Sequence, residues 1–331
     1  MTVPRPTPPH RLATTLTALV LPLLLVAATA AVALSWRDRL PGTVAVHWGA
    51  SGEPDGFGSP LELVAVPLVL APLFAIGMWA LAFWAGRDTS TRRLAAGFST
   101  GLAVLLSVIT LGSLGMQLDL SDATDSPGLG GVTTLAFGAA LAVGIGVALV
   151  VPPSPAQPTD APIDPAAVRT DLAPTERAAW RRTVTSRVGG WVAGAAVLVI
   201  VVLALALRTP GLLLVAAALA ALLASNLVVR VSVDARGLVA RSPLGWPSVR
   251  VPLDEVLAAR AARVDPFGEF GGWGYRIGTD GRVGFVLRKG EAVEVERTGG
   301  RVTVVTVDDA ATAAALLNTL ADRARGATIA S

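Results

Sequence analysis

The sequence of 331 residues has no cysteine, a single lysine, a single tyrosine and two histidines. The absence of cysteine excludes a disulfide-stapled fold and a thiolate-bound metal site. Charged residues are also scarce, at 15% where soluble domains average about 25%, which argues against a soluble globular enzyme. The net charge is only +3 and no stretch packs five or more basic residues, so nothing indicates nucleic acid as a partner.

What the sequence has in excess is apolar surface, with 53% hydrophobic residues. Six apolar segments reach the length of about 20 residues that a helix needs to cross a bilayer. We therefore expect a polytopic α-helical membrane protein with six transmembrane helices, at residues 12–34, 61–86, 94–116, 130–151, 189–207 and 211–229. Their cores hold no charged residue, whereas ion-coupled carriers place charges inside the bundle. Gly97 and Gly101, like Gly190 and Gly194, are spaced by four residues, which lets helix backbones pack closely, and Asn226 is expected to make a packing hydrogen bond.

Arginines are distributed unevenly over the connections between these segments. One alternating set, which includes the N-terminal tail, holds ten arginines and the other set holds three: Arg5, Arg11, Arg87, Arg92, Arg93, Arg169, Arg177, Arg181, Arg182 and Arg187 against Arg37, Arg39 and Arg208. Arginine-rich connections face the cytoplasm, so we expect both termini there. The preference for arginine over lysine, with abundant alanine, suggests a GC-rich bacterial genome. The expected location is the bacterial plasma membrane, which the chain crosses several times.

This pattern divides the chain into five parts. We expect a cytoplasmic tail (1–11), a four-helix membrane domain (12–151) with an outer loop (35–60), a linker region (152–187), a two-helix transmembrane hairpin (188–229) and a cytoplasmic domain (230–326). The first half of the linker region is rich in Pro, Ala and Asp and is expected to be extended. A short juxtamembrane helix is predicted to follow, starting near Pro174 and laying Trp180 along the inner leaflet.

The cytoplasmic domain alternates apolar and polar residues, as half-buried strands do. Turn residues separate about seven such strands. Asp308 is predicted to cap a final helix with an apolar face made of Ala313, Leu316, Leu317 and Leu320. This order of elements, together with the aromatic and glycine-rich run at 265–275, resembles the bacterial pleckstrin-homology-like fold. The resemblance covers about residues 228–325 and implies a mainly-β domain closed by one helix.

The run at 265–275 contains three aromatic residues spaced by glycines: Phe267, Phe270 and Trp273. As a mobile loop with apolar tips, they would contact the inner leaflet or a cytoplasmic protein. Alternatively, they cover one open end of the β domain. The arginines of this domain predict no compact phosphoinositide pocket, because they are scattered along the sequence: Arg241, Arg250, Arg260 and Arg263.

The most patterned stretch is the first outer loop, at residues 40–59. It is predicted to be a short extended run that ends in His-Trp and is followed by glycine and Pro-Asp-Gly turns. Seven residues resemble, in order and spacing, the N-terminal membrane domain of unknown function of the SdpI-type immunity proteins: Pro41, His47, Trp48, Gly52, Pro54, Asp55 and Phe57. The resemblance covers about residues 12–120. It implies resistance to a secreted toxic peptide and relay of its presence to a cytoplasmic repressor.

Two features depart from that family. Gly49 stands where Asn or Asp is common, and the C-terminal half of the chain replaces the remaining helices of the immunity proteins. An outside-to-inside binding or relay role is compatible with both departures. The seven residues of the outer loop are therefore the candidate partner-binding site.

Catalysis and metal binding at the outer loop are the rival interpretations. His47 and Asp55 would need Ser51 or Ser59 for a hydrolytic triad, and a short loop seldom holds that geometry. A metal site would need more ligands than His47, Asp55 and Glu53 supply. We therefore predict no enzyme, no cofactor and no metal.

The predicted function is that of a non-enzymatic sensor or an immunity-like, envelope-stress protein. Its outer loop would bind a secreted peptide or an envelope protein, and its C-terminal domain would contact a cytoplasmic protein or inner-leaflet lipid. The alternatives are a transporter or transporter accessory, a membrane enzyme that uses the outer loop, and a membrane assembly scaffold.

Overall fold

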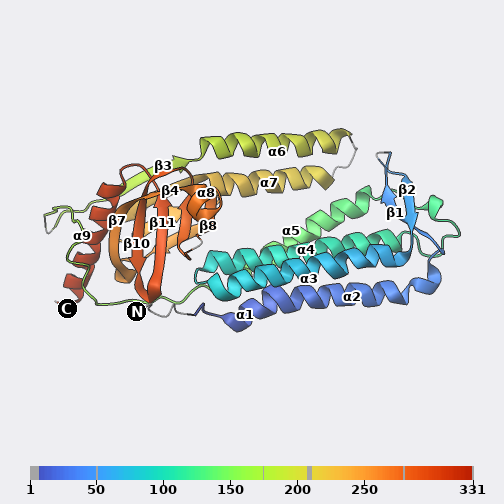
Figure 1. The fold of residues 1–331 in the computed structure, drawn as a ribbon, viewed down its shortest axis with the longest axis horizontal. Helices are drawn as coiled ribbons and strands as arrows, with labels where there is room; N and C mark the ends of the chain where they lie inside the picture. Colours follow the sequence, from blue (N-terminus) through green and yellow to red (C-terminus); the bar gives the residue numbers. More distant parts are fainter. Residues whose placement is uncertain (1–6, 50, 174, 207–210, 279, 330–331) are drawn as a thin grey trace. The chain divides into compact units, whose positions relative to one another are not determined.

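The structure of the protein is a computed structural model that describes residues 7–49, 51–173, 175–206, 211–278 and 280–329. Its contacts divide the chain into two compact units. The membrane unit comprises residues 8–154 and 195–219, and the β unit comprises residues 155–194 and 220–331 together with 1–7. Figure 1 shows the helices and strands of both units. Arg5 and Arg208, which entered the arginine count, lie outside the described residues.

Five helices in the described part of the chain are long and apolar enough to cross a membrane. The first is one run of α1 (Arg11–Thr15), the π-helical turn η1 (Leu16–Val20) and α2 (Leu21–Ser35). The others are α3 (Pro60–Ala85), α4 (Thr89–Gly115), α5 (Gly130–Val150) and α6 (Arg187–Ala206). A further helix, α7 (Gly211–Leu227), is apolar but only 17 residues long. The structure therefore supports five of the six predicted spans.

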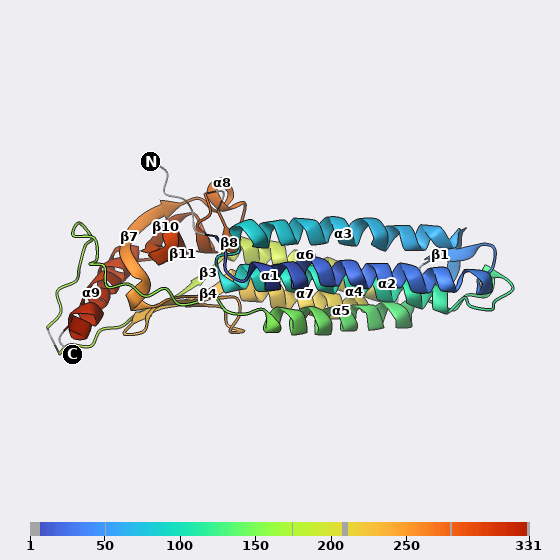
Figure 2. The same ribbon diagram turned by 90° about the horizontal axis from the view of Figure 1, so that it is seen from below.

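Within the membrane unit, α4 packs against α2, α3 and α5, which run beside it in Figure 2. Small residues allow this packing, because a Cβ on Gly97 would lie 2.9 Å from the carbonyl oxygen of Gly144 on α5. The predicted close approach at Gly97 is thus confirmed, whereas a Cβ on Gly190 or Gly194 would meet no described atom within 4 Å. Hydroxyl groups add hydrogen bonds between helices, as Ser99 donates to the carbonyl oxygen of Ala18 over 2.6 Å. Close backbone contact of this kind drives helix association in lipid.

The described part of the β unit contains two sheets and two helices, besides the ends of α6 and α7. One sheet has four antiparallel strands in chain order, β3 (Trp180–Thr185), β4 (Val228–Asp234), β5 (Gly237–Arg241) and β6 (Ser248–Val251). The other has five strands in the order β7 (Val256–Val264), β10 (Gly290–Arg297), β11 (Arg301–Thr306), β9 (Val283–Val286) and β8 (Gly274–Ile277). All pairs in the second sheet are antiparallel except β11 with β9. The helices are the short α8 (Pro266–Phe270) and the C-terminal α9 (Ala310–Ile329).

The predicted juxtamembrane helix is wrong. The residues around Trp180 form the strand β3, which pairs along its whole length with β4. Trp180 and Val184 are buried while the residues between them are exposed, so the segment follows the two-residue period of a strand with an irregularity at Arg182. The pairing partner lies more than 40 residues further along the chain, and no local sequence pattern indicates this pairing.

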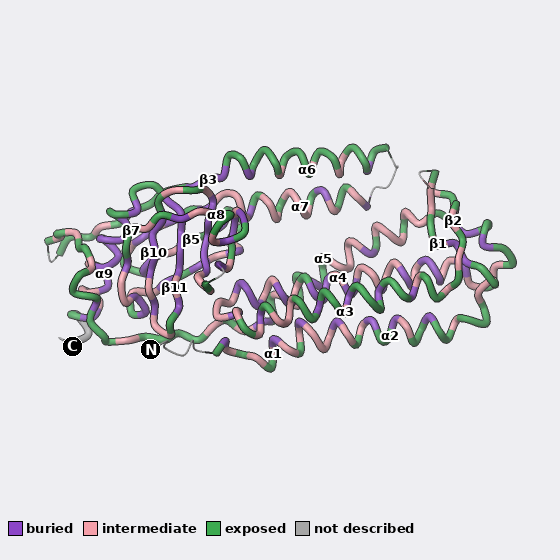
Figure 3. Tube along the Cα trace, in the orientation of Figure 1, coloured by how far each residue is buried: buried purple, intermediate pink, exposed green. Residues whose placement is uncertain are grey.

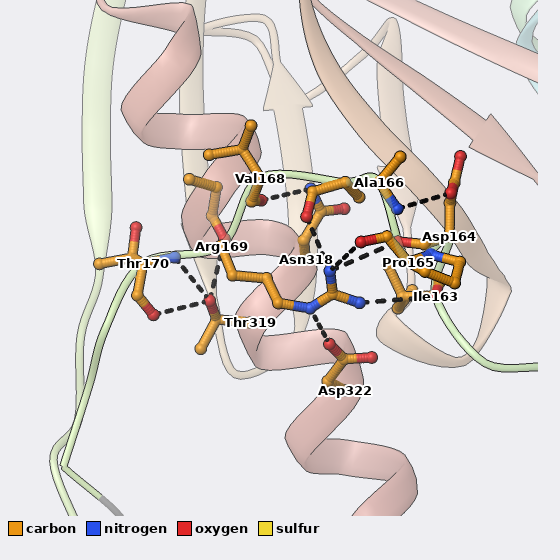
Figure 4. Close-up of polar contacts among 12 residues, drawn as sticks. Ile163, Asp164, Pro165, Ala166, Val168, Arg169, Thr170, Asn318, Thr319 and Asp322 are labelled. Carbon is orange, nitrogen blue, oxygen red and sulfur yellow. Dashed lines mark hydrogen bonds and ion pairs between the residues drawn. The ribbon is translucent and has the colours of Figure 1, made fainter.

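The proline-rich segment at 155–173, here called the strap, is extended as predicted but is not a free linker. Figure 4 shows it lying along α9, where Asn318 donates to the carbonyl oxygen of Val168 over 2.9 Å. Arg169 pairs with Asp322 over 2.5 Å. These contacts satisfy backbone groups that a strap without secondary structure would otherwise leave to water. The strap is therefore an integral part of the β unit.

The core of the β unit lies between its sheets and α9, as the buried residues in Figure 3 show. The apolar face predicted for the last helix is confirmed, since all four of its residues are buried: Ala313, Leu316, Leu317 and Leu320. The predicted N-cap is shifted by one residue. Asp308 pairs with Arg288 instead, and Asp309, directly before the helix, accepts a hydrogen bond from the Thr312 hydroxyl.

Candidate functional site

The outer loop folds into a two-stranded antiparallel hairpin, β1 (Val44–Trp48) and β2 (Pro54–Gly58), here called the hairpin. His47 lies opposite Gly56, and a Cβ on that glycine would lie 2.8 Å from the His47 Cβ. Gly52 has a φ of +86° in the connecting turn, a conformation that glycine adopts without strain. The glycines of the motif therefore make room for the turn and for the histidine.

A buried amide anchors the hairpin to the helices. Gln117, two residues beyond the end of α4, is fully buried and its Oε1 accepts from the Ala45 backbone N–H over 2.6 Å. Its Nε2 donates to the carbonyl oxygens of Ala45 and Ser113 over 3.1 and 3.0 Å. Val44 is also fully buried, in a cluster with residues of α2, α3 and α4. Gln117 was not predicted from the sequence, where its only signal is a polar residue at the end of an apolar segment.

The connection between α4 and α5 packs against the other end of the hairpin. Trp48 Nε1 donates to the carbonyl oxygen of Pro127 over 3.0 Å. A Cβ on Gly128 would lie 2.9 Å from the carbonyl oxygen of Gly52. Trp48, one of the predicted site residues, is therefore half-buried and structural in its contacts, and Pro41 is half-buried as well.

An ion pair holds the first residues of the connection between α4 and α5. Arg39 donates to Asp119 from Nε over 3.1 Å and from Nη2 over 2.5 Å, and the Asp119 N–H donates to the Arg39 carbonyl oxygen. The hydrogen bonds from the guanidinium lower the pKa of Asp119. Hydrogen bonds from the backbone and hydroxyl of Thr124 likewise lower the pKa of Asp122. These carboxylates fix local loop structure, as Asx turns do.

The exposed part of the hairpin carries a histidine–aspartate pair. His47 Nδ1 and Asp55 Oδ1 are 2.5 Å apart, while their side chains are 71% and 53% exposed. Phe57, two residues further along β2, is 44% exposed. Gly49 leaves space for this arrangement, because a Cβ there would lie 2.7 Å from Asp55 Oδ2. The hairpin thus presents an imidazole, a carboxylate and an aromatic ring to solvent on an anchored base.

The two serines considered for a triad make other contacts. Ser51 accepts a hydrogen bond from the Glu53 N–H over 3.3 Å. Ser59 forms a capping box with Glu62 at the start of α3. Among the residues that the structure describes, no three His, Asp or Glu side chains come together as a metal site would require. The side chains exposed on the hairpin are suited to polar and aromatic recognition, and they include one hydrogen-bonded imidazole.

The three aromatic residues proposed for the β unit have different environments. Phe270 is 4% exposed in the core, with the guanidinium carbon of Arg282 lying 5.2 Å from its ring centroid. Phe267 is 60% exposed and stacks edge-on with Trp273 at 4.8 Å between ring centroids. The first half of the expected mobile loop is the helix α8, capped by the Asp265 side chain, which accepts from two backbone N–H groups, and Trp273 follows the helix. The structure therefore separates Phe270 from the other two aromatics.

Comparison with known families bears on the hairpin. Residues 23–71 match DUF1648, a domain of unknown function. This domain occurs in SdpI-like membrane proteins. The matched segment includes most of α2, the hairpin with its seven candidate residues and the first half of α3. No curated protein and no solved structure matched the chain.

Proposed function

We propose that this membrane protein is a non-enzymatic receptor whose hairpin binds a secreted peptide or an envelope component. The observation that carries the proposal is the exposed His47–Asp55 pair beside Phe57 on an anchored hairpin. A hydrogen-bonded pair this exposed contributes only about 0–1 kcal/mol to folding, so stability gives little reason for its presence. An immobile base lowers the entropic cost of binding, since the site does not have to be ordered by its ligand.

The proposed orientation is that of a bacterial plasma-membrane protein with both termini in the cytoplasm and the hairpin outside. The arginine distribution supports it, because Arg11, Arg87, Arg92 and Arg93 flank the helix ends remote in sequence from the hairpin. α7 would be the sixth span, since 17 helical residues rise about 26 Å. Sheets followed by a C-terminal helix support a pleckstrin-homology-like classification of the β unit.

A relay role is supported by the connections of α6 and α7. A single residue, Ser186, separates β3 from α6, and β4 follows α7 directly. The Ser186 N–H donates to the carbonyl oxygen of Leu227 over 2.9 Å, which ties the two junctions together. A displacement of these helices would therefore reach the four-stranded sheet without a flexible joint.

Photo-crosslinking in living cells tests the proposed binding. A photoreactive amino acid replaces Phe57, and the same amino acid at Thr43, an exposed residue directly before β1, serves as the control. We expect a discrete peptide or protein adduct at position 57 that is absent at position 43. His47→Ala or Asp55→Ala in the position-57 protein should abolish the adduct.

Two results would contradict the proposal. Adducts with lipid alone, or no adduct, would make the hairpin a structural lid. Equal adducts at positions 57 and 43, unaffected by His47→Ala, would indicate nonspecific proximity. Accumulation of a small-molecule substrate that depends on the protein would instead favour the transporter alternative.

A further inference from the structure

The outward face of the four-stranded sheet collects arginines that are far apart in sequence. Directly paired residues on neighbouring strands point to the same side of a sheet. One row across the sheet therefore contains Thr183, Arg230, Arg241 and Ser248, and the next contains Arg181, Ser232, Val239 and Arg250. Between these rows Val231, Ala240 and Val249 are buried, whereas Arg182 on β3 is exposed and pairs with Asp309. We call the face formed by the four arginines the basic face.

The basic face is hollowed and short of negative charge. An open groove of about 740 Å³ runs over it, lined by Arg181, Arg230 and Arg241 among others. Its described lining includes no acidic residue. Asp234, at one end of β4, is engaged by Arg236 in the following turn over 2.8 Å. An anion in the groove would therefore meet arginines whose charges the groove itself does not compensate.

The cross-strand pairing of Arg230 with Arg241 supports the binding of an anion between their side chains. The two residues are direct cross-strand partners on an exposed face. Like charges in this position repel and destabilise the sheet. A phosphate group between two guanidinium groups replaces that repulsion with charge-assisted hydrogen bonds, for which the planar fork of arginine is well suited.

The position of the row that contains Arg230 and Arg241 favours a phosphate that belongs to a membrane lipid. Arg230 is three residues beyond the end of α7, which corresponds to about 10 Å of extended strand. The headgroup layer on each side of a bilayer is several ångströms thick, so the Arg230 side chain can reach it from the end of an inserted helix. The next row, with Arg181 and Arg250, lies two residues further along the strands.

An exposed leucine occupies the same end of the sheet. β5 runs antiparallel to β4, so the turn at 242–247 returns to the level at which α7 ends. Leu244 in this turn is 64% exposed and lines the groove beside Arg241. An apolar tip next to paired arginines is the arrangement by which peripheral proteins bind the headgroup and acyl boundary.

We propose that the basic face binds anionic phospholipid headgroups of the leaflet into which α6 and α7 insert. Arg230 and Arg241 hold the lipid phosphate, Leu244 enters the acyl boundary, and Arg181 and Arg250 add long-range attraction. This site is distinct from the hairpin and does not depend on its ligand. Strand pairing brings Arg241 and Arg250, which are distant in sequence, onto one face with two other arginines, whereas Arg260 and Arg263 lie on β7 in the other sheet.

The chain offers a clean test because it has no cysteine. Leu244→Cys in the full-length protein is labelled with a polarity-sensitive dye and reconstituted in phosphatidylcholine vesicles, with or without phosphatidylglycerol. Ala235→Cys, in the exposed turn at the opposite end of β4, is the matched control. We expect a blue shift at position 244 that requires phosphatidylglycerol, and no shift at position 235.

Charge variants then assign the shift to the basic face. Arg230→Gln with Arg241→Gln should weaken phosphatidylglycerol binding about fivefold for each arginine removed. The lysine pair Arg230→Lys with Arg241→Lys should retain most of the binding, which also shows that the sheet tolerates substitution. Arg177→Gln with Arg263→Gln, at two exposed positions away from the face, removes the same charge and should change nothing.

Three outcomes would overturn the proposal. An equal shift in phosphatidylcholine alone would show that the lipid charge is irrelevant. A shift produced by inorganic phosphate with phosphatidylcholine vesicles would make the groove a site for free phosphate. Equal losses in the Arg230/Arg241 and Arg177/Arg263 glutamine pairs would reduce the effect to net charge.

Discussion

The hairpin and the basic face are two exposed polar surfaces that the chain builds in opposite ways. All candidate residues of the hairpin lie within 17 positions, from Pro41 to Phe57, and one turn brings them together. The basic face takes its arginines from four strands that span residues 180–251, with α6 and α7 inserted between the first two. A local site is visible in the sequence as a motif, whereas a site made by strand pairing is visible only in the fold.

The hairpin and the β unit also differ in their buried polar contacts. The hairpin depends on neutral hydrogen bonds to the side chain of Gln117, whereas the β unit contains a buried ionic cluster. In that cluster Glu255 Oε2 accepts from Arg297 and Arg301 over 2.5 and 2.9 Å, and all three side chains are at most 7% exposed. Substitutions at these buried and exposed contacts can separate their contributions to stability.

The largest effect is expected from Glu255→Gln. Two buried guanidinium groups would lose their counter-charge, and breaking a buried pair in this way costs about 3–5 kcal/mol. Burial acts to raise the pKa of Glu255, but the hydrogen bonds and charges of Arg297 and Arg301, with the Gln157 N–H, hold that pKa below its ordinary value. The stabilisation is therefore present at neutral pH and is lost as the pH falls through the lowered pKa.

Hydrogen exchange of β10 and β11 in the full-length protein during denaturant titration measures this loss. Glu296→Gln is the matched control, since Glu296 is 43% exposed in its ion pair with Arg260. Its loss should cost less than about 1 kcal/mol. Equal destabilisation by the two substitutions would show that burial of the Glu255 cluster has no special importance.

Gln117→Leu is expected to have the next largest effect, this time on the hairpin. It removes three hydrogen bonds and leaves the Ala45 N–H and carbonyl without their buried partner, at a cost of about 1–3 kcal/mol. The Ala45 amide should exchange faster, while the core of the β unit should be unaffected. Thr124→Val, at an exposed position on the same connection, is the control. Unchanged exchange at Ala45 would show that the Gln117 amide does not anchor the hairpin.

Several features of the structure follow from local sequence patterns. The apolar face of α9 and the close packing at Gly97 follow from the period of a helix, and both were predictable. The hairpin follows from a short extended run and its turn residues. The pairing of His47 with Asp55 needs only that the two strands meet, so most of the candidate site could be read locally.

What could not be predicted depends on partners distant in sequence. β3 was expected to be a helix because its strand partner, β4, follows two apolar helices. The strap was expected to be a linker because its partners are side chains of α9, such as Asn318. Gln117 and the Arg230–Arg241 pair were unpredictable for the same reason. The role of each depends on a contact with a residue that is distant or unpaired in the sequence pattern.

A smaller effect is expected from Arg39→Gln at the edge of the hairpin. Hydrogen bonds from Arg39 lower the pKa of Asp119, so this carboxylate stabilises the folded connection above its unfolded pKa. That contribution disappears as the pH falls through the lowered pKa, in the acid range below about pH 4. In the variant the pKa of Asp119 should rise toward its ordinary value, which carboxyl-carbon NMR resonances can follow. An unchanged titration would show that the ion pair is not formed in solution.

The smallest effect on stability is expected from His47→Ala with Asp55→Ala, although the effect on binding should be complete. The pair is exposed, so its loss should change the free energy of unfolding by less than about 1 kcal/mol. Exchange at Ala45 should remain as in the unmodified protein, because Gln117 and Val44 still hold the base of the hairpin. A hairpin that loosened as much as in Gln117→Leu would make the pair a structural element. A hairpin that stays folded and no longer crosslinks through position 57 would show that its local, exposed chemistry serves recognition while distant, buried contacts hold it in place.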